Sequence, residues 1–355
     1  MNLNLSKYQR QISLKSFGLD KQSKLSQSHV LIIGLGGLGV PVAQYLNAMG
    51  VGTLGIMDQD TIALNNLHRQ VLYTEDEVGQ TKTEIAAKKL QKQNTQTKII
   101  AIPEFLNKEN ALESINRYDV VVDASDNFAT RYLVNDACVI LNKPFVYGAL
   151  HDFEGQVSVF NYNDGPTYRC LFPSMPKNDE IPNCDENGVL GVLPGILGSI
   201  QALEVVKILT GIGEVLSGRL LLINALTHEN RLVHFKSQSG NKNIKALADS
   251  YENEVCSSDD RIDVGSYLER KGKKQLIDVR SIEEFNADHL DEAVSIPLQD
   301  LQKRMDEINL ERPVYLICQS GRRSAQAAQL LSELHPKTRF YSIDGGMNQI
   351  ASLCQ

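Results

Sequence analysis

The stretch HVLIIGLGGLGVPVAQYLNAMG, residues 29–50, decides the fold of the first part of this chain. Its apolar run 29–33 predicts a buried strand, and the apolar periodicity after Gly39 predicts a helix. Between them lies the glycine turn Gly34-Leu35-Gly36-Gly37-Leu38-Gly39. Because glycine lacks a side chain, backbone N–H groups and the helix N-terminus can approach a phosphate closely. The order of strand, glycine turn and helix therefore predicts a phosphate-binding, Rossmann-like unit.

An acidic residue follows at the end of a second predicted strand. Asp58 lies in the run TLGIMDQD. In glycine-turn folds, a carboxylate about 20 residues downstream normally binds the ribose hydroxyls. A nicotinamide-dependent dehydrogenase would have the same two features, so they leave the nucleotide class open.

Residues beyond Asp58 favour a triphosphate over a nicotinamide dinucleotide. Arg69 and Lys82 carry charges that can neutralise a phosphate chain, although each residue taken singly is more often a solvated surface charge. Asp126, past the predicted strand VVVD, can hold Mg²⁺ against phosphate oxygens. Hydride transfer requires none of these groups. An NAD-dependent oxidoreductase with redox thiols remains the alternative.

With these residues in order, the chain resembles the MoeB/ThiF family, bacterial relatives of ubiquitin-activating enzymes. Members adenylate the C-terminal glycine of a ubiquitin-like sulfur carrier, and the resemblance covers most of residues 1–236. It implies that the glycine turn binds ATP phosphates, that Asp58 binds the ribose, and that Asp126 holds Mg²⁺. The implied nucleotide-binding residues are Gly34, Gly36, Gly37, Gly39, Asp58, Asn65, Asn66, Leu67, His68, Arg69, Lys82, Asp126 and Asn127.

Arg10, in KYQRQISL, matches an arginine that reaches the nucleotide from the partner subunit in this family. The resemblance therefore implies a homodimer. An arginine near an N-terminus is otherwise usually a surface residue, which is the alternative interpretation of Arg10.

Composition excludes several classes of partner. The net charge is −7 and no basic stripe stands out, so we expect neither a nucleic acid nor an anionic membrane as partner. The apolar stretch VLGVLPGILGSI is too short and too rich in glycine to span a bilayer, and the N-terminus lacks a signal pattern. Six scattered cysteines make no secreted disulfide framework. We expect a cytoplasmic protein with free thiols.

The 355 residues predict two α/β domains. Strand and helix patterns alternate over residues 29–149, as in a doubly wound, mostly parallel sheet, and EGQVSVFNY adds an exposed antiparallel strand. GSIQALEVVKILTG predicts a helix that ends at Gly211. The predicted organisation is an ATP-binding domain over 1–236, a polar linker over 237–261 and a smaller α/β domain over 262–355.

The chemistry of the second domain lies in Cys318-Gln319-Ser320-Gly321-Arg322-Arg323, between the strand VYLI and a helix. Backbone N–H groups and two guanidinium groups around this cysteine would favour its thiolate. Together with Asp278-Val279-Arg280 and Glu284-Phe285, His289 and Asp344-Gly345-Gly346, the loop makes residues 262–350 resemble a rhodanese domain. The resemblance implies a persulfide on Cys318, with Arg323 in the catalytic loop.

The Cys318 loop has two alternative interpretations. Phosphatases of related sequence have one more residue between the catalytic cysteine and the arginine. In this chain Arg323 comes one position earlier, and Ser324 stands at the position of the phosphatase arginine. The shorter loop favours sulfur transfer over phosphate hydrolysis. An inert buried cysteine at the end of a strand is the other alternative.

Cys184 follows the polar, proline-rich segment FPSMPKNDEIPN, which predicts a mobile loop. In the family, the matching cysteine forms a thioester or an acyl disulfide with the carrier, whereas a surface cysteine without function is the alternative. The family also holds a structural zinc between two C-x-x-C pairs. Here Thr167 and Asn253 replace the first cysteine of each pair, leaving Cys170 and Cys256, so we expect no zinc.

Taken together, the two resemblances imply a sequence of adenylation and sulfur transfer. The carrier, of MoaD or ThiS type and ending in Gly-Gly, would be adenylated and then converted to a thiocarboxylate. A cysteine desulfurase or another persulfide donor would charge Cys318. Molybdopterin synthesis is the favoured pathway, and thiamine synthesis and tRNA thiolation are the alternatives.

Overall fold

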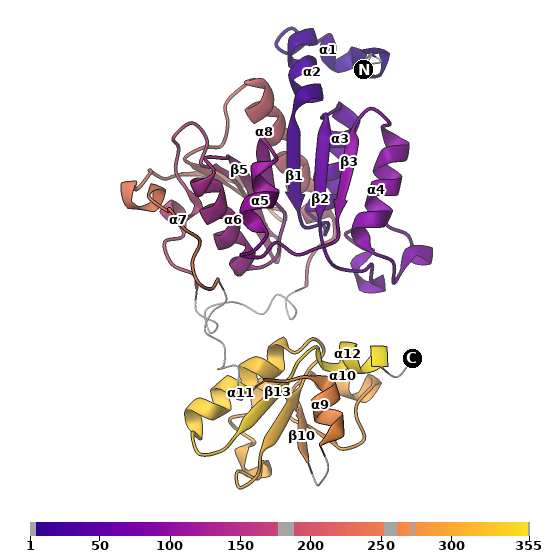
Figure 1. The fold of residues 1–355 in the computed structure, drawn as a ribbon, viewed down its shortest axis with the longest axis vertical. Coiled ribbons are helices and arrows are strands. Elements are labelled where there is room, and N and C mark those ends of the chain that lie inside the picture. Colours follow the sequence, from indigo (N-terminus) through magenta and orange to yellow (C-terminus); the bar gives the residue numbers. More distant parts are fainter. Residues whose placement is uncertain (1–4, 177–187, 252–260, 271–273, 354–355) are drawn as a thin grey trace. The chain divides into compact units, whose positions relative to one another are not determined.

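The computed structural model describes residues 5–176, 188–251, 261–270 and 274–353. The chain divides into two compact units, Met1–Tyr251 and Glu252–Gln355. Each unit is built around its own sheet, so the expected pair of α/β folds is confirmed (Figure 1).

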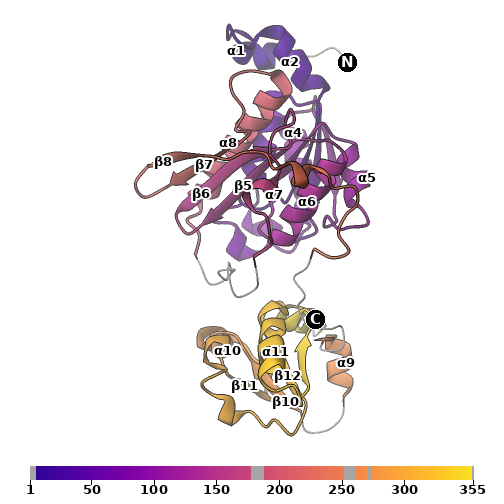
Figure 2. The same cartoon turned by 90° about the vertical axis from the view of Figure 1, so that its left-hand side faces the viewer.

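The first unit contains an eight-stranded mixed sheet in the order β3-β2-β1-β4-β5-β6-β7-β8. The strands from β3 to β5 are parallel, and β6, β7 and β8 continue the sheet in antiparallel fashion (Figure 2). Strand order reverses direction between β1 and β4, and ligands of doubly wound folds bind beyond the C-terminal ends of strands at such a point. The strands are β1 (His29–Ile33), β2 (Thr53–Met57), β3 (Lys98–Ile102), β4 (Val120–Asp123), β5 (Phe145–His151), β6 (Glu154–Phe160), β7 (Arg219–Asn224) and β8 (Asn230–His234).

Helices cover both faces of this sheet. Successive apolar side chains of β1 point to opposite faces, so Val30 and Ile32 join one core and Leu31 and Ile33 the other. The first core is shared with α2, α3, α4 and α8, and the second with α5, α6 and α7. The helices are α1 (Gln9–Ile12), α2 (Gly18–Gln27), α3 (Gly39–Met49), α4 (Lys82–Gln93), α5 (Ala111–Asn116), α6 (Phe128–Ile140), α7 (Tyr168–Leu171) and α8 (Val192–Thr210).

Helix α8 begins earlier than the sequence predicted. It runs from Val192 to Thr210 and ends at Gly211, whose φ of +72° is the expected left-handed cap. Pro194 lies in the first turn, where proline does not interrupt a helix. With a mean hydropathy of 1.6, α8 is long and apolar enough to cross a membrane, but half of it is buried within the fold. Core helices of soluble proteins share these properties, so this single helix is weak evidence for a membrane span.

Strand β6 was expected to be an exposed strand, and this expectation is wrong. Five of its seven residues are buried, because β5 and β7 pair with its two edges and α8 packs against it.

Residues 237–251, which the sequence assigned to the linker, lie on the first unit. Asn241 donates to the Arg169 carbonyl at 2.9 Å, and the Tyr251 hydroxyl donates to Asp136 at 2.8 Å.

The second unit is a five-stranded parallel sheet in the order β11-β10-β12-β13-β9. Its apolar residues again divide into two cores, one on each side of the sheet. The strands are β9 (Arg261–Ile262), β10 (Gln275–Asp278), β11 (Ala293–Ser295), β12 (Val314–Ile317) and β13 (Phe340–Ile343). The helices are α9 (Val264–Glu269), α10 (Ile282–Ala287), α11 (Arg322–Leu334) and α12 (Gly346–Leu353).

An aromatic cluster gives a test of how the antiparallel extension is held. Phe160 is fully buried and its ring lies 5.3 Å from that of Phe145 and 5.6 Å from that of Tyr168. We expect Phe160→Ala to lower the free energy of opening of β5 and β6 by roughly 3 to 5 kcal/mol. Hydrogen exchange of the backbone amides in these strands measures this change. Phe153→Ala is the control, because Phe153 is 42% exposed; an equal loss in both variants would contradict the packing argument.

Candidate functional site

The glycine turn is held by two close backbone approaches. Gly34 has a φ of +93°, and a Cβ atom built on it would lie 2.7 Å from the carbonyl oxygen of Ala124. A Cβ on Gly39 would lie only 1.8 Å from the Gly34 carbonyl oxygen. Gly37 lies against Pro194 of α8, whereas a Cβ on Gly36 would meet only the Gln70 side chain, at 3.8 Å. The four glycines therefore serve different purposes: Gly34 and Gly39 shape the turn, and Gly36 leaves its surface open.

Asp58 fixes the turn as well as being the candidate ribose ligand. One carboxylate oxygen accepts the Leu35 N–H at 2.7 Å, and the other accepts the Asp60 N–H at 2.8 Å. Burial raises the pKa of Asp58, and the positive charge of Lys82 partly offsets this effect. The carboxylate therefore has a defined orientation before any ligand is bound.

Lys82, at the start of α4, is not a solvated surface residue. Its side chain is 5% exposed and its ammonium group lies 2.8 Å from Asp60 and 3.9 Å from Asp58. Asp60 was not among the predicted site residues. Its position two residues after Asp58, just beyond β2, is the sequence signal that could have identified it.

Arg69 lies beside the glycine turn and within electrostatic range of Asp126. A Cβ on Gly37 would be 3.5 Å from the Arg69 side chain. The guanidinium group donates to the Asn65 carbonyl at 2.9 Å and lies next to the His68 ring. Burial lowers the pKa of Arg69, and the negative charge of Asp126 partly offsets this effect.

The remaining predicted residues of this site take different positions. Asn66 is half-buried and its amide donates to the Asn65 side chain, while Leu67 packs at the edge of the first core. The Asn127 side chain caps α6 by accepting the Thr130 N–H at 2.8 Å. The preceding residue, Asp126, is exposed in the loop between β4 and α6. The start of α8 closes the other side, because a Cβ on Gly191 would lie 2.2 Å from the His68 carbonyl oxygen.

Arg10 does not lie at this site within its own chain. It is exposed on α1, whose Gln11 donates to the Met49 carbonyl at 3.0 Å. Met49 is the last residue of α3, which begins at the glycine turn. The helix spans 11 residues, or about 16 Å, so α1 lies at the opposite end of the sheet from the turn.

Cys318 lies at the C-terminal end of β12, as expected, but it is fully buried. Its sulfur is 3.5 Å from the Ser324 hydroxyl, which in turn is 2.9 Å from the Ser342 hydroxyl. The turn before α12 packs onto the loop, because the Met347 N–H donates to the Cys318 carbonyl at 2.9 Å. A Cβ on Gly346 would lie 2.1 Å from that carbonyl oxygen, which explains the glycine pair at this turn.

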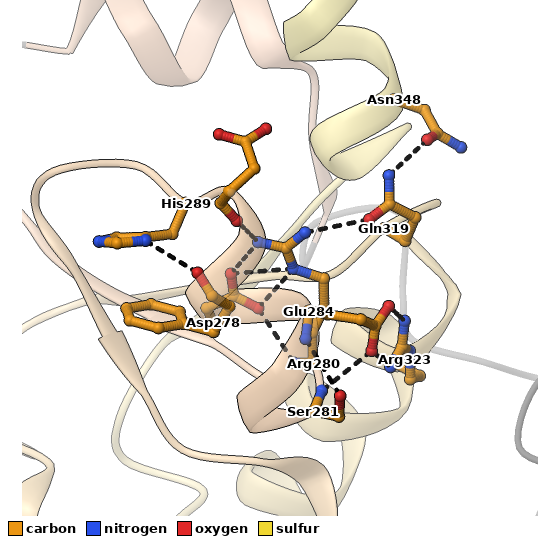
Figure 3. A network of polar contacts seen from close by, with 10 residues as sticks. Asp278, Arg280, Ser281, Glu284, His289, Gln319, Arg323 and Asn348 are labelled. Carbon is orange, nitrogen blue, oxygen red and sulfur yellow. Dashed lines mark hydrogen bonds and ion pairs between the residues drawn. The ribbon is translucent and has the colours of Figure 1, made fainter.

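Arg323, one of the two arginines expected near the Cys318 sulfur, forms an ion pair with a carboxylate. Its guanidinium group binds both carboxylate oxygens of Glu284, at 2.6 and 2.7 Å (Figure 3). This contact is the main reason that the pKa of Glu284 falls to about 2. The side chain of Arg322 is outside the described part of the chain.

A second ion pair supports the loop from the other side. Arg280 is 3% exposed and binds the fully buried Asp278 at 2.7 Å. It also donates to the Gln319 side chain at 3.0 Å, and Gln319 donates to Asn348 of α12 at 2.7 Å (Figure 3). The residue after Cys318 is therefore tied to both β10 and α12. His289 stacks on Phe285 at the edge of this network.

The position of the family's zinc site is occupied by hydrogen bonds where it is described. The Cys170 sulfur accepts the Gln238 N–H at 3.3 Å, contacts the Thr167 hydroxyl at 3.4 Å and lies 3.8 Å from the Asn241 amide. Burial raises the pKa of Cys170, but these hydrogen bonds outweigh it and lower the pKa overall. A backbone N–H, a hydroxyl and a side-chain amide are not among the thiolate, imidazole and carboxylate ligands that zinc sites use. Cys184, Asn253 and Cys256 lie outside the described residues.

Comparisons with known proteins agree with this geometry. The ThiF family matches residues 8–245, and the rhodanese-like domain matches residues 263–353. The protein named adenylyltransferase and sulfurtransferase MOCS3 from Aedes aegypti is 40% identical over 94% of this chain and 83% of its own length. The protein of the same name from Xenopus laevis is 38% identical over 98% of this chain and 86% of its own length.

Among solved structures, the first unit resembles E. coli MccB. A crystal structure of MccB with ATP gives a TM-score of 0.57 at 22% identity, covering 64% of this chain and 74% of that chain. At this level of identity the likeness establishes the fold alone. The sequence matches go further: the chain belongs to the ThiF family and carries a rhodanese-like domain at its C-terminal end.

Proposed function

We propose that this chain uses ATP to activate the C-terminal glycine of a ubiquitin-like sulfur carrier and then transfers sulfur to it from Cys318. The observation that carries the proposal is the gathering of Arg69, Lys82 and Asp126 around the Gly34–Gly39 turn. Hydride transfer has no use for such a set, so an NAD-dependent oxidoreductase is disfavoured. The names of the relatives, adenylyltransferase and sulfurtransferase, describe the same two activities.

In the first step, a carboxylate oxygen of the carrier attacks the α-phosphorus of ATP and pyrophosphate leaves. Backbone N–H groups of the glycine turn and the start of α3 bind phosphate oxygens, and Asp58 orients the ribose. Arg69 and Lys82 offset the negative charge that gathers on the phosphates. Their fixed orientations mean that little reorganisation is needed as the bond forms.

A magnesium ion fits this site through Asp126. The carboxylate is exposed at the end of β4, faces the Arg69 side of the site, and offers the oxygen ligand that Mg²⁺ prefers. When bound, the ion supplies charge neutralisation on the phosphate oxygens. Asn127 is committed to capping α6, so Asp126 is the proposed protein ligand.

In the second step, the terminal sulfur of a Cys318 persulfide attacks the acyl carbon and AMP leaves. The Arg280–Gln319 contact and the packing of α12 hold the Cys318 loop for this transfer. A cysteine desulfurase or a related persulfide donor loads Cys318. The Cys184 thiolate then attacks the Cys318 sulfur of the resulting acyl disulfide, so that the S–S bond breaks and the thiocarboxylate leaves; a cellular thiol reduces the Cys184–Cys318 disulfide that remains.

The carrier is proposed to be a MoaD-type protein that ends in Gly-Gly, and its pathway is molybdopterin synthesis or tRNA thiolation. Thiamine synthesis uses the same chemistry. Incubation of the full chain with ATP and each such carrier, followed by mass spectrometry of the carrier, identifies the one that gains AMP and then sulfur.

The two activities should be separable by substitution. We expect Arg69→Ala and Asp126→Asn each to lower ATP–pyrophosphate exchange about 100-fold or more, since they remove charge stabilisation in the transition state. Both variants should keep sulfur transfer from thiosulfate to cyanide. Cys318→Ser should have the opposite pattern, losing cyanide-dependent sulfur transfer and keeping exchange.

One control variant and two contradicting outcomes make this test specific. Cys138→Ala removes a buried thiol of the first unit and should affect neither assay by more than its effect on folding. Exchange that survives Asp126→Asn at the wild-type rate would contradict the proposed ATP site. Cyanide-dependent activity that survives Cys318→Ser would contradict the proposed persulfide.

The active form is proposed to be a homodimer. Arg10 lies at the far end of α3 from the glycine turn of its own chain, so it can reach a nucleotide only from a second copy. α8 also presents an exposed apolar face, with Val192 61%, Ile196 43% and Leu203 49% exposed. Their spacing places the three side chains along one side of the helix.

Subunit mixing tests the role of Arg10. We expect Arg10→Ala and Asp126→Asn homodimers to be inactive in exchange, because each lacks one part of every site. Mixed dimers should regain activity, since one of their two sites contains both Arg10 and Asp126. Mixtures with Lys15→Ala in place of Arg10→Ala provide the control, and mixtures that stay inactive after subunit exchange would contradict the shared site.

The chain is proposed to fold without zinc, because Thr167 and Asn253 stand where the two C-x-x-C pairs would need their first cysteines. We expect purified protein to hold no stoichiometric zinc by elemental analysis, and a chelator to leave its thermal midpoint unchanged. Thr167→Cys with Asn253→Cys restores both C-x-x-C pairs and should bind zinc, which serves as the positive control. One zinc per wild-type chain would contradict the proposal.

A further inference from the structure

A buried pair of opposite charges lies beneath the loop that carries Asp126. Asp123, the last residue of β4, is fully buried, and Arg131 on the first turns of α6 is 8% exposed. Neither residue was among the predicted site residues. Arg131 stands four positions after the capping Asn127, so the helix places it back under the same loop.

Both residues hold Ser125, the neighbour of Asp126. One oxygen of Asp123 accepts the Ser125 N–H at 3.0 Å and the Ser125 hydroxyl at 2.6 Å. The Arg131 guanidinium group donates to the Ser125 carbonyl at 3.3 Å. Asp123 therefore holds the peptide unit before Ser125, and Arg131 holds the peptide unit after it. Asp126 follows directly on this second peptide unit.

This arrangement is a poor device for stability alone. Within the described residues, the second oxygen of Asp123 and the Nε atom of Arg131 are buried without a hydrogen-bond partner. Burial raises the pKa of Asp123, and the charge of Arg131 only partly offsets this effect. Buried charges whose hydrogen bonds are incomplete are often less stabilising than apolar side chains of similar size. A contribution to stability therefore does not explain why a positively charged residue occupies position 131.

The loop also bears directly on the glycine turn. A Cβ atom built on Gly34 would lie 2.7 Å from the Ala124 carbonyl oxygen. The Ala124 N–H also donates to the Ile33 carbonyl at 2.9 Å. A displacement of residues 124–126 would therefore move Asp126 relative to the phosphate-binding backbone. Arg131 stacks on the Phe128 and Tyr147 rings, which limits its own movement.

We propose that Arg131 is a positioning residue for the magnesium site: by holding the Ser125 carbonyl, it aims the Asp126 carboxylate at the metal that accompanies ATP. This inference rests on the proposed function, which assigns Mg²⁺ to Asp126. It differs from a role in folding, because it concerns the metal-dependent part of ATP binding. Asp123 lies within electrostatic range of Arg131 and binds the N–H and hydroxyl of the same Ser125.

The test is calorimetric titration of the full chain with ATP over a series of free Mg²⁺ concentrations, including none. For Arg131→Met we expect the Mg²⁺ concentration that half-maximally strengthens ATP binding to rise about tenfold, the equivalent of one hydrogen bond from a charged donor. Affinity for ATP without Mg²⁺ should stay within about twofold of wild type, since the glycine turn and Asp58 are untouched.

A double variant covers the possibility that Arg131→Met leaves an unpaired buried carboxylate and fails to fold. Asp123→Asn with Arg131→Met removes both charges while the asparagine oxygen still accepts the Ser125 N–H. It should fold and keep the Mg²⁺ shift, because the Ser125 carbonyl is still not held. Arg117→Met is the matched control: Arg117 is exposed and pairs with Glu113, and its removal should change neither quantity.

The outcomes separate the two hypotheses. A wild-type Mg²⁺ response in Asp126→Asn would overturn the magnesium assignment itself. Loss of the response in Asp126→Asn with a wild-type response in the double variant would overturn only the role of Arg131. Equal weakening of ATP binding with and without Mg²⁺ in the double variant would assign Arg131 to folding and also overturn it.

Discussion

The first site depends on the close contact between the backbone at Gly34 and the backbone at Ala124. These residues follow β1 and β4, the neighbouring strands at which the sheet order reverses. The contact is too close for any side chain at Gly34, so the phosphate-binding turn and the Asp126 loop form one rigid surface. Arg69, Lys82 and Asp126 are arranged around that surface. A change at either strand end would therefore alter both the nucleotide and the metal parts of the site.

Much of the fold and of the site could be predicted because the signals are local. The glycine turn, Asp58 and Asp126 each follow a short apolar strand, and parallel strands bring their C-terminal ends to one edge. Gly211 was correctly placed as the end of α8 because a left-handed cap has a strong residue preference. The two-domain α/β organisation followed from the second alternation of strands and helices after the polar segment.

The residues that were missed act through contacts distant in sequence. β6 reads as a half-exposed strand, but α8, which covers it, comes more than 30 residues later. Arg131 and Asp60 look like ordinary charges until the fold shows them buried or paired. Likewise, the pairing of Arg323 with Glu284 of another helix was not predicted. No local pattern reports which acidic residue will meet a given arginine.

In each unit a buried cation near the candidate site is paired with a carboxylate before a ligand arrives, and this pairing shapes how ligands bind. Lys82 is 5% exposed but its partner Asp60 is 55% exposed, so Asp60 can turn into water when a phosphate takes its place. Moving a largely hydrated carboxylate costs little, whereas a buried Lys82 ammonium group without a partner would destabilise the fold. Arg280 differs, since its partner Asp278 is fully buried and cannot leave. Lys82 is therefore suited to exchange partners during a reaction, and Arg280 to hold the loop that carries Cys318 in a constant position.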